Sequence, residues 1–414
     1  MRFIRSFIPA IRWSNSLTFK RRASIDYLVS SLNRTEDTYK DEHPSQKCNI
    51  KKLKPSEIPP KDSTKLVISP NELTDHFRYK EYPKPTRRQI SETQALFNNS
   101  SFKLEWTLDK YDEIPYIKYK RLKEEKTEKL SKVEPYRKTE YHLTQLNSKK
   151  TFGIQPEHLK PMPEVLLLGN TNVGKSSLIN SLLVNREENK SANLTTEHAF
   201  VSKRAGYTKT LNCFNIGNKL RIMDSPGYGE FGELSQGEVI TDYITKGQSL
   251  RRVFVLIDSV KGFQEEDLHI IDFLISEGIS FDLIFTKVDQ VIQKFMPKKL
   301  INSKHANKSK SVEERVNNAT LIKQCNKKVI DYFGSMIEES NMSNLVTLPK
   351  LFFNNVQTNK FVPGRQGYKE IRYEILLSCG LVKEDTIGSD TAIQEETMMK
   401  QNALRKKTKV QRLM

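Results

Sequence analysis

The segment EVLLLGNTNVGKSSLINSLL, residues 164–183, constrains the fold more than any other part of the chain. Its first five residues are mostly apolar, a glycine-containing turn follows them, and an amphipathic run comes next. The apolar run predicts a buried strand and the amphipathic run predicts a helix. A strand that leads through a glycine turn into a helix is the first unit of an α/β fold with a parallel sheet.

The turn in this segment has the pattern of a phosphate-binding loop. Gly169 and Gly174 let the backbone curl so that successive N–H groups point inward, at the positive end of the helix that follows. Lys175 can place its charge on the β- and γ-phosphates of a nucleotide, and the hydroxyl of Ser176 can ligate Mg²⁺. An ordinary glycine turn before a lysine is the alternative, which the strand-and-helix context disfavours. We expect nucleotide contacts from the whole turn, which comprises Gly169, Asn170, Thr171, Asn172, Val173, Gly174, Lys175, Ser176 and Ser177.

Apolar runs alternate with amphipathic runs after this turn. The apolar runs are LNCFNI, LRIMD, RRVFVLID, FDLIF and LPKLFF. Continuous apolar runs are typical of parallel strands that are buried on both faces. The first two flank a Gly-Asn turn and predict a hairpin. With right-handed crossovers, the pattern predicts a doubly wound, mostly parallel six-stranded sheet that has one antiparallel edge strand and helices on both faces.

The residues after FDLIF indicate which base the nucleotide carries. They read TKVD, from Thr286 to Asp289. A carboxylate at this position can accept from the ring N–H and the exocyclic amine of guanine, whereas adenine presents a lone pair there. A buried carboxylate left unpaired penalises the wrong base steeply, and Lys287 can lay its aliphatic stem over the right one. TKVD alone could be a surface turn, but downstream of a phosphate loop it predicts GTP and GDP as ligands.

Two further segments predict the metal ligands and the groups that sense the γ-phosphate. In MDSPGYGE, Asp224 can hold Mg²⁺ through water and the N–H of Gly227 can contact the γ-phosphate, although a simple hairpin-end turn is the alternative. In RAGYTKTLNCF, Thr208 can offer Mg²⁺ its hydroxyl, with Thr210 as its competitor. The expected metal ligands are therefore Ser176, Thr208 and Asp224. The groups expected to support catalysis are Lys175, Thr208 and Gly227.

These segments, in this order, resemble the EngB (YihA) family of ribosome-assembly GTPases in the TrmE-Era-EngA-EngB superfamily. The resemblance covers roughly residues 86–115 and 160–380. It implies a P-loop GTPase domain that hydrolyses GTP to GDP and phosphate with Mg²⁺. The family's last base-contacting element would fall at FFNNVQ, where Asn354 and Asn355 stand in for it. The family pattern carries over to Lys175, Ser176, Thr208, Asp224, Gly227, Lys287 and Asp289.

The chain also departs from the family pattern. The family usually has an arginine where the loop reads GNTN, and Ala205 and Tyr207 replace its proline and arginine. Tyr228 stands where many GTPases have a water-orienting glutamine. A phenol does not donate and accept as a carboxamide does, so we expect unaided hydrolysis at roughly 10⁻⁴ to 10⁻² per second. The resemblance suggests K⁺ held partly by Asn172, or a partner that completes the site. The alternative is that Asn172 merely tolerates the backbone of the loop.

The rest of the chain is polar and basic. Of its 414 residues 36% are hydrophobic and 29% charged, with a net charge of +18. This balance favours one packed domain with polar extensions and a polyanionic partner, with solubility alone as the alternative. Residues 1–25 are amphipathic, rich in arginine and free of acids, as in a mitochondrial transit peptide. A disordered basic arm or a nuclear signal is the alternative, so the mitochondrial matrix is expected ahead of the nucleolus or the chloroplast.

The composition divides the remaining chain into four parts. We expect a disordered or polar extension at 26–85, a segment at 86–160 that packs on the core and carries a charged insert, the GTPase domain at 161–380 with a basic insert at 290–340, and a basic tail at 381–414. No apolar run approaches the roughly 20 residues that a membrane span needs.

These features together predict a monomeric GTP-dependent switch in mitochondrial ribosome assembly or mitochondrial translation. Its expected partner is a ribosomal subunit or its rRNA precursor, because lysine runs interleaved with tyrosines suit contact with RNA. Binding would differ between the GTP and GDP forms through residues 195–212 and 224–240. A non-catalytic RNA- or ribosome-binding scaffold with a structural nucleotide is one alternative. A P-loop GTPase that acts in tRNA modification is another, but the sequence offers no additional catalytic domain for it.

Overall fold

The computed structural model describes most of the central part of the chain. It covers residues 59–60, 62–132, 144, 150–184, 199, 210–228, 234–297, 308–340, 342, 345 and 348–382. The expected transit peptide, the basic tail from residue 383 onward and Thr208 lie outside these residues.

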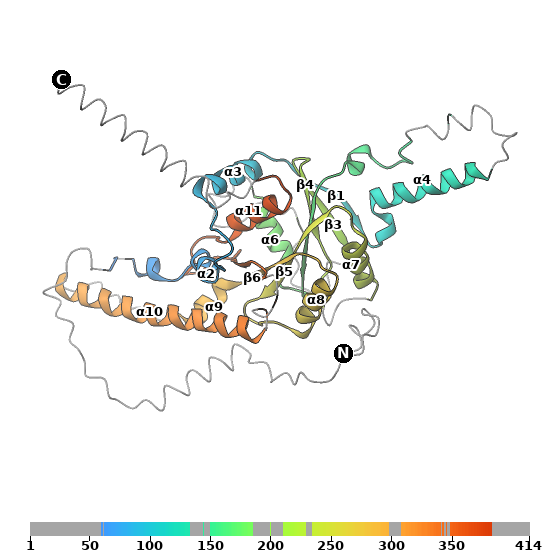
Figure 1. Ribbon diagram of the computed structural model, residues 1–414. Helices are drawn as coiled ribbons and strands as arrows, with labels where there is room; N and C mark the ends of the chain where they lie inside the picture. Colours follow the sequence, from blue (N-terminus) through green and yellow to red (C-terminus); the bar gives the residue numbers. More distant parts are fainter. Residues whose placement is uncertain are drawn as a thin grey trace, which may run out of the picture.

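The described residues form a seven-stranded sheet with helices on both faces (Figure 1). The strands are β1 (Phe102–Leu108), β2 (Glu164–Gly169), β3 (Leu211–Ile216), β4 (Leu220–Asp224), β5 (Leu250–Asp258), β6 (Phe281–Thr286) and β7 (Leu351–Phe353). They lie in the order β1-β3-β4-β2-β5-β6-β7. Among these strands β3 runs antiparallel to its neighbours β1 and β4, and the other pairs are parallel. The doubly wound, mostly parallel α/β fold is confirmed.

The sheet has seven strands where the sequence predicts six, because β1 extends it. β1 pairs with β3 from Phe102 opposite Ile216 to Leu108 opposite Leu211. The antiparallel strand β3 is therefore the second strand from the edge, and β1 is the edge strand. The segment expected to pack on the core from 86 onward thus contributes to the sheet itself.

Alternate side chains of the strands feed two hydrophobic cores. In β2, Val165 and Leu167 face one core, and Leu166 and Leu168 face the other. The first core is covered by α3 (Arg87–Asn98), α6 (Lys175–Leu182) and α11 (Tyr368–Ser378). The second core is covered by α7 (Leu234–Lys246), α8 (Glu265–Ser276), α9 (Val288–Phe295) and α10 (Lys308–Glu339). Burial on both faces explains why these strands read as continuous apolar runs.

The N-terminal extension is ordered over part of its length, so the expectation of disorder is wrong for residues 62–76. They form η3 (Ser63–Leu66) and α2 (Pro70–His76). Ser69 caps α2, since its hydroxyl accepts from the N–H of Glu72 while the Glu72 carboxylate accepts from the N–H of Ser69. Leu73 is fully buried in the second core. A capping box and a buried leucine stabilise this helix in a segment that is polar overall.

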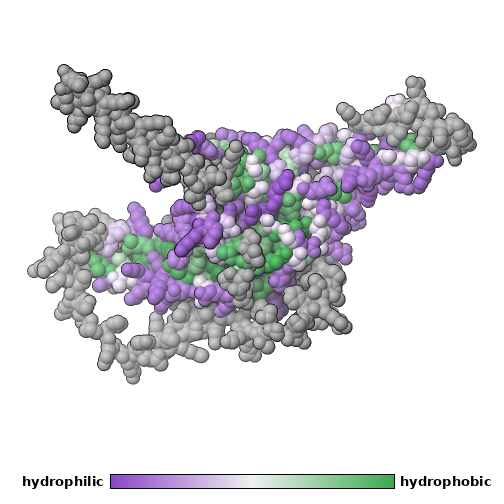
Figure 2. Space-filling model, in the orientation of Figure 1, coloured by the Kyte–Doolittle hydropathy of each residue, from purple (hydrophilic) through white to green (hydrophobic). Residues whose placement is uncertain are grey.

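The described parts of the two expected charged inserts are largely helical. The first contains α4 (Pro115–Ser131), which follows η4 (Tyr111–Glu113), and the short η6 (Pro156–Leu159) comes after it. α4 projects from the body of the molecule and its surface is hydrophilic (Figures 1 and 2). The second insert, 290–340, contains most of α9 and all of α10. None of the helices that the structure describes is long and apolar enough to cross a membrane.

A buried arginine joins the three helices of the first core. The guanidinium of Arg372 on α11 donates to the carbonyl oxygen of Leu182 at 2.7 and 2.9 Å and to that of Val184 at 2.9 Å. It also donates to the side chain of Gln94 on α3 at 2.6 Å. These bonds satisfy carbonyl groups at the C-terminus of α6 that the helix itself leaves unpaired.

Candidate functional site

The phosphate loop connects the buried strand β2 to α6 and is tightly folded. A Cβ atom added to Gly169 would lie 2.7 Å from Cγ1 of Val173, so this position needs glycine. Gly174 has φ +108°, and Asn172 has φ +61°. Asparagine is one of the few residues other than glycine that enters the left-handed region readily. The loop geometry therefore agrees with the role of Asn172 as a residue that tolerates an unusual backbone, and it leaves the K⁺ hypothesis as a prediction.

Lys175 folds back over the loop. Its Nζ donates to the carbonyl oxygens of Gly169 at 2.7 Å and Asn170 at 3.2 Å, and only 7% of the residue is exposed. Burial lowers the pKa of Lys175 to about 8, against the opposing charges of Asp224 and Asp267. A phosphate at the loop would replace neutral carbonyl acceptors by charged ones, which form stronger hydrogen bonds with an ammonium.

Asp224 and Ser176 provide adjacent oxygen atoms beside the loop. Asp224 ends β4 and is 1% exposed, and its Oδ2 lies 3.5 Å from Oγ of Ser176. Its Oδ1 is buried and has no hydrogen-bond partner among the residues that the structure describes. Burial raises the pKa of Asp224 to about 6, although the charge of Lys175 opposes the shift. A buried carboxylate oxygen without a partner, next to a hydroxyl, fits a hard cation with oxygen ligands such as Mg²⁺.

The loop after β4 packs directly on the phosphate loop. The N–H of Thr171 donates to the carbonyl oxygen of Tyr228 at 3.0 Å, and a Cβ atom added to Gly227 would lie 2.9 Å from Cα of Thr171. The hydroxyl of Tyr228 donates to Oδ1 of Asp267 at 2.8 Å. Oδ2 of Asp267 in turn accepts from the N–H of Gln264, which caps α8. The phenol is thus held by α8, while Gly227 lies against the phosphate loop.

The segment after β6 is tied to the phosphate loop by two side chains. Oγ1 of Thr286 donates to the carbonyl oxygen of Val173 at 2.7 Å. Nζ of Lys287 donates to the carbonyl oxygen of Asn172 at 2.7 Å and forms an ion pair with Asp258 at 2.6 Å. These contacts hold the predicted base-binding segment at a fixed position beside the phosphate loop.

Asp289 lies in the first turn of α9 and is 4% exposed. Burial raises its pKa to about 6, and hydrogen bonds from the backbone N–H groups of Asp289 and Gln290 oppose this shift. A carboxylate in such a place can discriminate between bases, because a base that fails to donate to it leaves it buried and unpaired.

Asn354 and Asn355 follow β7 and differ in what their side chains do. The carbonyl oxygen of Asn354 accepts from the N–H of Val288 at 3.3 Å, which places it beside the start of α9. Its Nδ2 donates to the carbonyl oxygen of Gln366 at 2.7 Å, and its buried Oδ1 has no partner within the described part of the chain. The side chain of Asn355 bonds instead to backbone groups of Gln357, Gly364 and Gln366. Asn354 therefore has an acceptor that a ligand can use, whereas Asn355 stabilises the loop.

The predicted site residues that the structure describes lie at the carboxyl ends of β2, β4, β6 and β7. Ligands of doubly wound sheets bind at this edge. Thr208 lies outside the described residues, so its expected role stays a prediction. Sequence reasoning missed Asp258 and Asp267. Asp258 could have been found, since it ends the strand RRVFVLID at the same edge, but no local pattern relates Asp267 to Tyr228.

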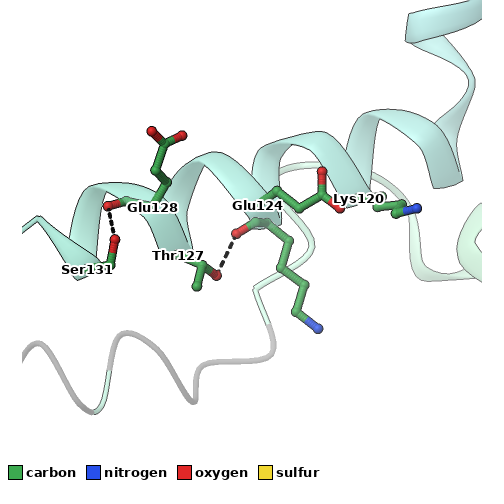
Figure 3. Close-up of a pocket in the computed structure, with 6 residues that line it drawn as sticks. Lys120, Glu124, Thr127, Glu128 and Ser131 are labelled. Carbon is green, nitrogen blue, oxygen red and sulfur yellow. Dashed lines mark hydrogen bonds between the residues drawn. The ribbon is translucent and has the colours of Figure 1, made fainter.

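A hollow of about 540 Å³ elsewhere in the structure contains neither the phosphate loop nor a buried carboxylate. It lies along α4 and is lined by Lys120, Lys123, Glu124, Thr127, Glu128 and Ser131 (Figure 3). The hydroxyls of Thr127 and Ser131 bond to carbonyl oxygens of their own helix. Its lining is thus a solvated helix face, and we assign the site to the phosphate loop.

A phosphate loop, a carboxylate beside its serine and a second buried carboxylate after β6 define a nucleotide site of the P-loop GTPase class. Residues 164–287 match the family described as 50S ribosome-binding GTPase. The chain is 32% identical over 308 residues to MIOREX complex component 8 of Saccharomyces cerevisiae, with 73% of this chain and 77% of that protein covered. The chain belongs to this family, as an EngB-type GTPase.

Bacterial proteins and solved structures are also similar to the chain. A probable GTP-binding protein EngB of Rickettsia rickettsii is 39% identical over 136 residues, which cover 31% of this chain and 59% of that protein, less than two thirds of its length. The crystal structure of a probable GTP-binding protein engB aligns with 52% of this chain and 98% of that chain, at 16% identity and a TM-score of 0.29. GTPases of this class bind GTP and GDP, typically with Mg²⁺, and hydrolyse GTP.

Proposed function

We propose that this protein is a slow GTPase that acts as a nucleotide switch in mitochondrial ribosome assembly or mitochondrial translation. The observation that carries the proposal is the pairing of the phosphate loop with buried Asp289 through Thr286 and Lys287, whose side chains bond to carbonyl oxygens of that loop at 2.7 Å each. This arrangement fixes the distance between the phosphate end and the base end of one guanine nucleotide.

Each end of the nucleotide would be held by its own groups. At the phosphate end, Lys175 binds the β- and γ-phosphates, the loop N–H groups bind phosphate oxygens, and the N–H of Gly227 contacts the γ-phosphate. Ser176 and Asp224 would hold Mg²⁺, joined by Thr208 as we predict. Bound there, the metal compensates the charge of the phosphate oxygens.

At the base end, Asp289 accepts from the ring N–H and the amine of guanine, and the stem of Lys287 covers the ring. Oδ1 of Asn354 offers a further acceptor, supported by the loop that Asn355 stabilises. Adenine would leave Asp289 without its donors, which is why we propose GTP and GDP over adenine nucleotides.

The low rate follows from the environment of Tyr228. Its hydroxyl donates to Asp267, so the residue directly after Gly227 does not orient a water molecule for attack on the γ-phosphate. We propose that hydrolysis is accelerated by a partner that completes the site, or by K⁺ bound near Asn172.

The partner we propose is a mitochondrial ribosomal subunit or its rRNA precursor, bound by a monomer of this protein in the mitochondrial matrix. Support comes from the ribosome-binding family description, from the relative named as a MIOREX complex component, and from the acid-free N-terminus. The net charge of +18 suits the phosphates of RNA. Segments 195–212 and 224–240 would report whether GTP or GDP is bound.

Gradient sedimentation of mitochondrial lysate tests this proposal. With a non-hydrolysable GTP analogue, the protein should migrate with one ribosomal subunit, and with GDP it should remain at the top of the gradient. The Lys175→Ala variant should stay at the top with either nucleotide. Migration that ignores the nucleotide would contradict the switch and favour the scaffold.

A hydrolysis assay with purified ribosomal subunits further distinguishes the nucleotide switch from the non-catalytic scaffold. The switch predicts a rate that rises when ribosomal subunits are added, and the scaffold predicts no stimulation.

A further inference from the structure

The loop that connects β7 to α11 is hydrogen-bonded to Val288 and Asp289 at the base end of the proposed guanine site. We define residues 354–366 as the base-side loop. Its two ends nearly touch, because a Cβ atom added to Gly367 would lie 2.2 Å from the carbonyl oxygen of Phe353. Gly367 also has φ +86°, so no other residue fits here without strain. The conformation of the loop is therefore set largely at its two ends.

The two residues that flank the base-side loop, Phe353 and Gly367, are both hydrogen-bonded to α2. At the entry, the N–H of Phe353 donates to Oγ1 of Thr74 at 3.0 Å. At the exit, the N–H of Gly367 donates to Oδ1 of Asn71 at 2.9 Å. β7 is the edge strand opposite β1, and an edge strand presents backbone groups that need partners from outside the sheet. Thr74, which is 2% exposed, supplies such a partner.

The residues that flank α2 on both sides contact three elements of the GTPase domain. The ring of Phe77 packs against the ring of Phe353, with the two ring centroids 5.5 Å apart. Nη2 of Arg78 forms an ion pair with Glu370 on α11 at 2.6 Å. Towards the N-terminus, Oδ1 of Asn326 on α10 accepts from the N–H of Ile68 at 3.0 Å. α2 thus holds a fixed position relative to β7, α10 and α11.

The base-side loop is in turn hydrogen-bonded to the backbone of Val288 and Asp289. Nδ2 of Asn359 in the loop donates to the carbonyl oxygen of Asp289 at 2.7 Å. The carbonyl oxygen of Asn354 accepts from the N–H of Val288 at 3.3 Å. A continuous set of hydrogen bonds therefore leads from α2 through the base-side loop to the residue that reads the base.

We propose that Asn71 and Thr74 are positioning residues for guanine recognition and that the N-terminal segment 66–78 clamps the base end of the nucleotide site. This proposal rests on the proposed guanine site. The clamp lies outside the part of the chain that matches the family, residues 164–287. Nucleotide retention in this protein therefore depends on a segment that precedes the family-matched part by more than 80 residues.

The dissociation rate of fluorescently labelled GDP from the full-length protein tests the clamp. Asn71→Ala and Thr74→Val each remove one acceptor, and we expect each to speed dissociation about tenfold, equivalent to about 1.4 kcal/mol. Thr74→Ser keeps the hydroxyl and should retain the wild-type rate. The Mg²⁺ concentration that gives half-maximal retention should not change in any of these variants, because Ser176 and Asp224 are untouched.

Thr86→Ala is the matched control. Thr86 caps α3 through its hydroxyl, which accepts from the N–H of Gln89, and α3 packs on the other face of the sheet. Its loss should lower the melting temperature and leave GDP dissociation unchanged. Asn71 is exposed, so Asn71→Ala remains informative even where Thr74→Val fails to fold.

The outcomes separate the clamp from the site on which it rests. Wild-type rates in Asn71→Ala, or dissociation that speeds up in Thr86→Ala as much as in Asn71→Ala, would overturn the clamp while the guanine site stands. A wild-type protein that does not bind GDP at all would overturn the guanine site and the clamp with it.

Discussion

The phosphate end and the base end of the nucleotide site are held by different kinds of contact. At the phosphate end, Lys175 bonds to carbonyl oxygens five and six residues away. At the base end, Phe353 and Gly367 bond to side chains 279 and 296 residues earlier in the chain. The bonds of Lys175 are thus local, whereas the bonds that hold the base end join segments far apart in the chain.

This difference has a consequence for how the site can be regulated. The bonds of Lys175 need only β2 and α6, although Thr286 and Lys287 also donate to the phosphate loop. The base-side loop is flanked by bonds to α2, and the segment around α2 contacts α10 and α11. We therefore expect movements of these helices to alter nucleotide exchange through the base end.

The largest effect is expected at the phosphate end. Lys175→Ala should weaken GTP and GDP binding by at least roughly 100-fold, because a charge-assisted bond to phosphate is lost. Isothermal titration calorimetry measures this. Lys160→Ala is the control, since Lys160 is exposed and bonds to the carbonyl oxygen of Asn218. If Lys175→Ala bound GTP within threefold of the wild type, the loop would not be the phosphate site.

The next effect concerns the choice of base. Asp289→Asn should reduce the preference for GTP over ATP by roughly 100-fold, because an amide no longer repels the lone pair of adenine. Competition between GTP and ATP for the same site measures the preference. Asp272→Asn changes an exposed carboxylate of α8 and should have no effect. If Asp289→Asn kept the wild-type preference for GTP over ATP, residues other than Asp289 would have to recognise the base.

A smaller effect is expected from pH, measured without Mg²⁺. Asp224 and Lys175, with pKa values of about 6 and about 8, also change protonation in this range, so the contribution of Asp289 is the difference between the wild type and Asp289→Asn. The pKa of Asp289 is raised to about 6, so GDP binding should weaken as the pH falls from 7.5 to 5, by roughly tenfold at one unit below that pKa. Asp289→Asn should remove this contribution and leave the rest of the pH dependence in place.

The unliganded protein should respond to pH with the opposite sign. Because the folded-state pKa of Asp289 lies above its ordinary value, this group favours folding at low pH. Its contribution to the free energy of unfolding is lost as the pH rises through about 6. A thermal unfolding series from about pH 3.5 to 7.5 spans the ordinary pKa of 3.8 and the folded-state pKa of about 6, and comparing the wild type with Asp289→Asn isolates this contribution.

The smallest effect is expected from Tyr228→Phe. It removes one hydrogen bond to Asp267 and should lower the free energy of unfolding by about 1 kcal/mol. GDP affinity and the basal GTPase rate should stay within about threefold, because the hydroxyl is held by Asp267 of α8 and, as we propose, does not act on substrate. Tyr82→Phe, which loses a bond to the carbonyl oxygen of Leu348, is the matched control. A tenfold fall in rate in Tyr228→Phe alone would mean that the phenol takes part in hydrolysis.

The same difference between local and distant contacts explains what the sequence could predict. The strand–loop–helix unit, the carboxylate that ends β4 and the segment TKVD were predictable, because each is encoded by residues adjacent in the chain. The parallel sheet was also predictable from its apolar runs. β1 was harder to predict as a strand of the sheet, because it is partly exposed along its length and its sequence is therefore not continuously apolar.

Contacts between distant segments had no signal in a single sequence. Nothing local relates Tyr228 to Asp267, or Asn71 to Gly367. The segment around α2 reads as polar, and only Leu73 and the capping residues indicate a helix there. Its role becomes visible once the path of the chain brings it against β7.

Arg372 fixes the end of α6 that lies away from the phosphate loop. α6 begins at the phosphate loop, and its far end is bonded through Arg372 to α11 and α3. That end of α6 is therefore fixed to two other helices, and we expect any rearrangement on nucleotide binding at the opposite end, in the first turn of α6 and in the phosphate loop.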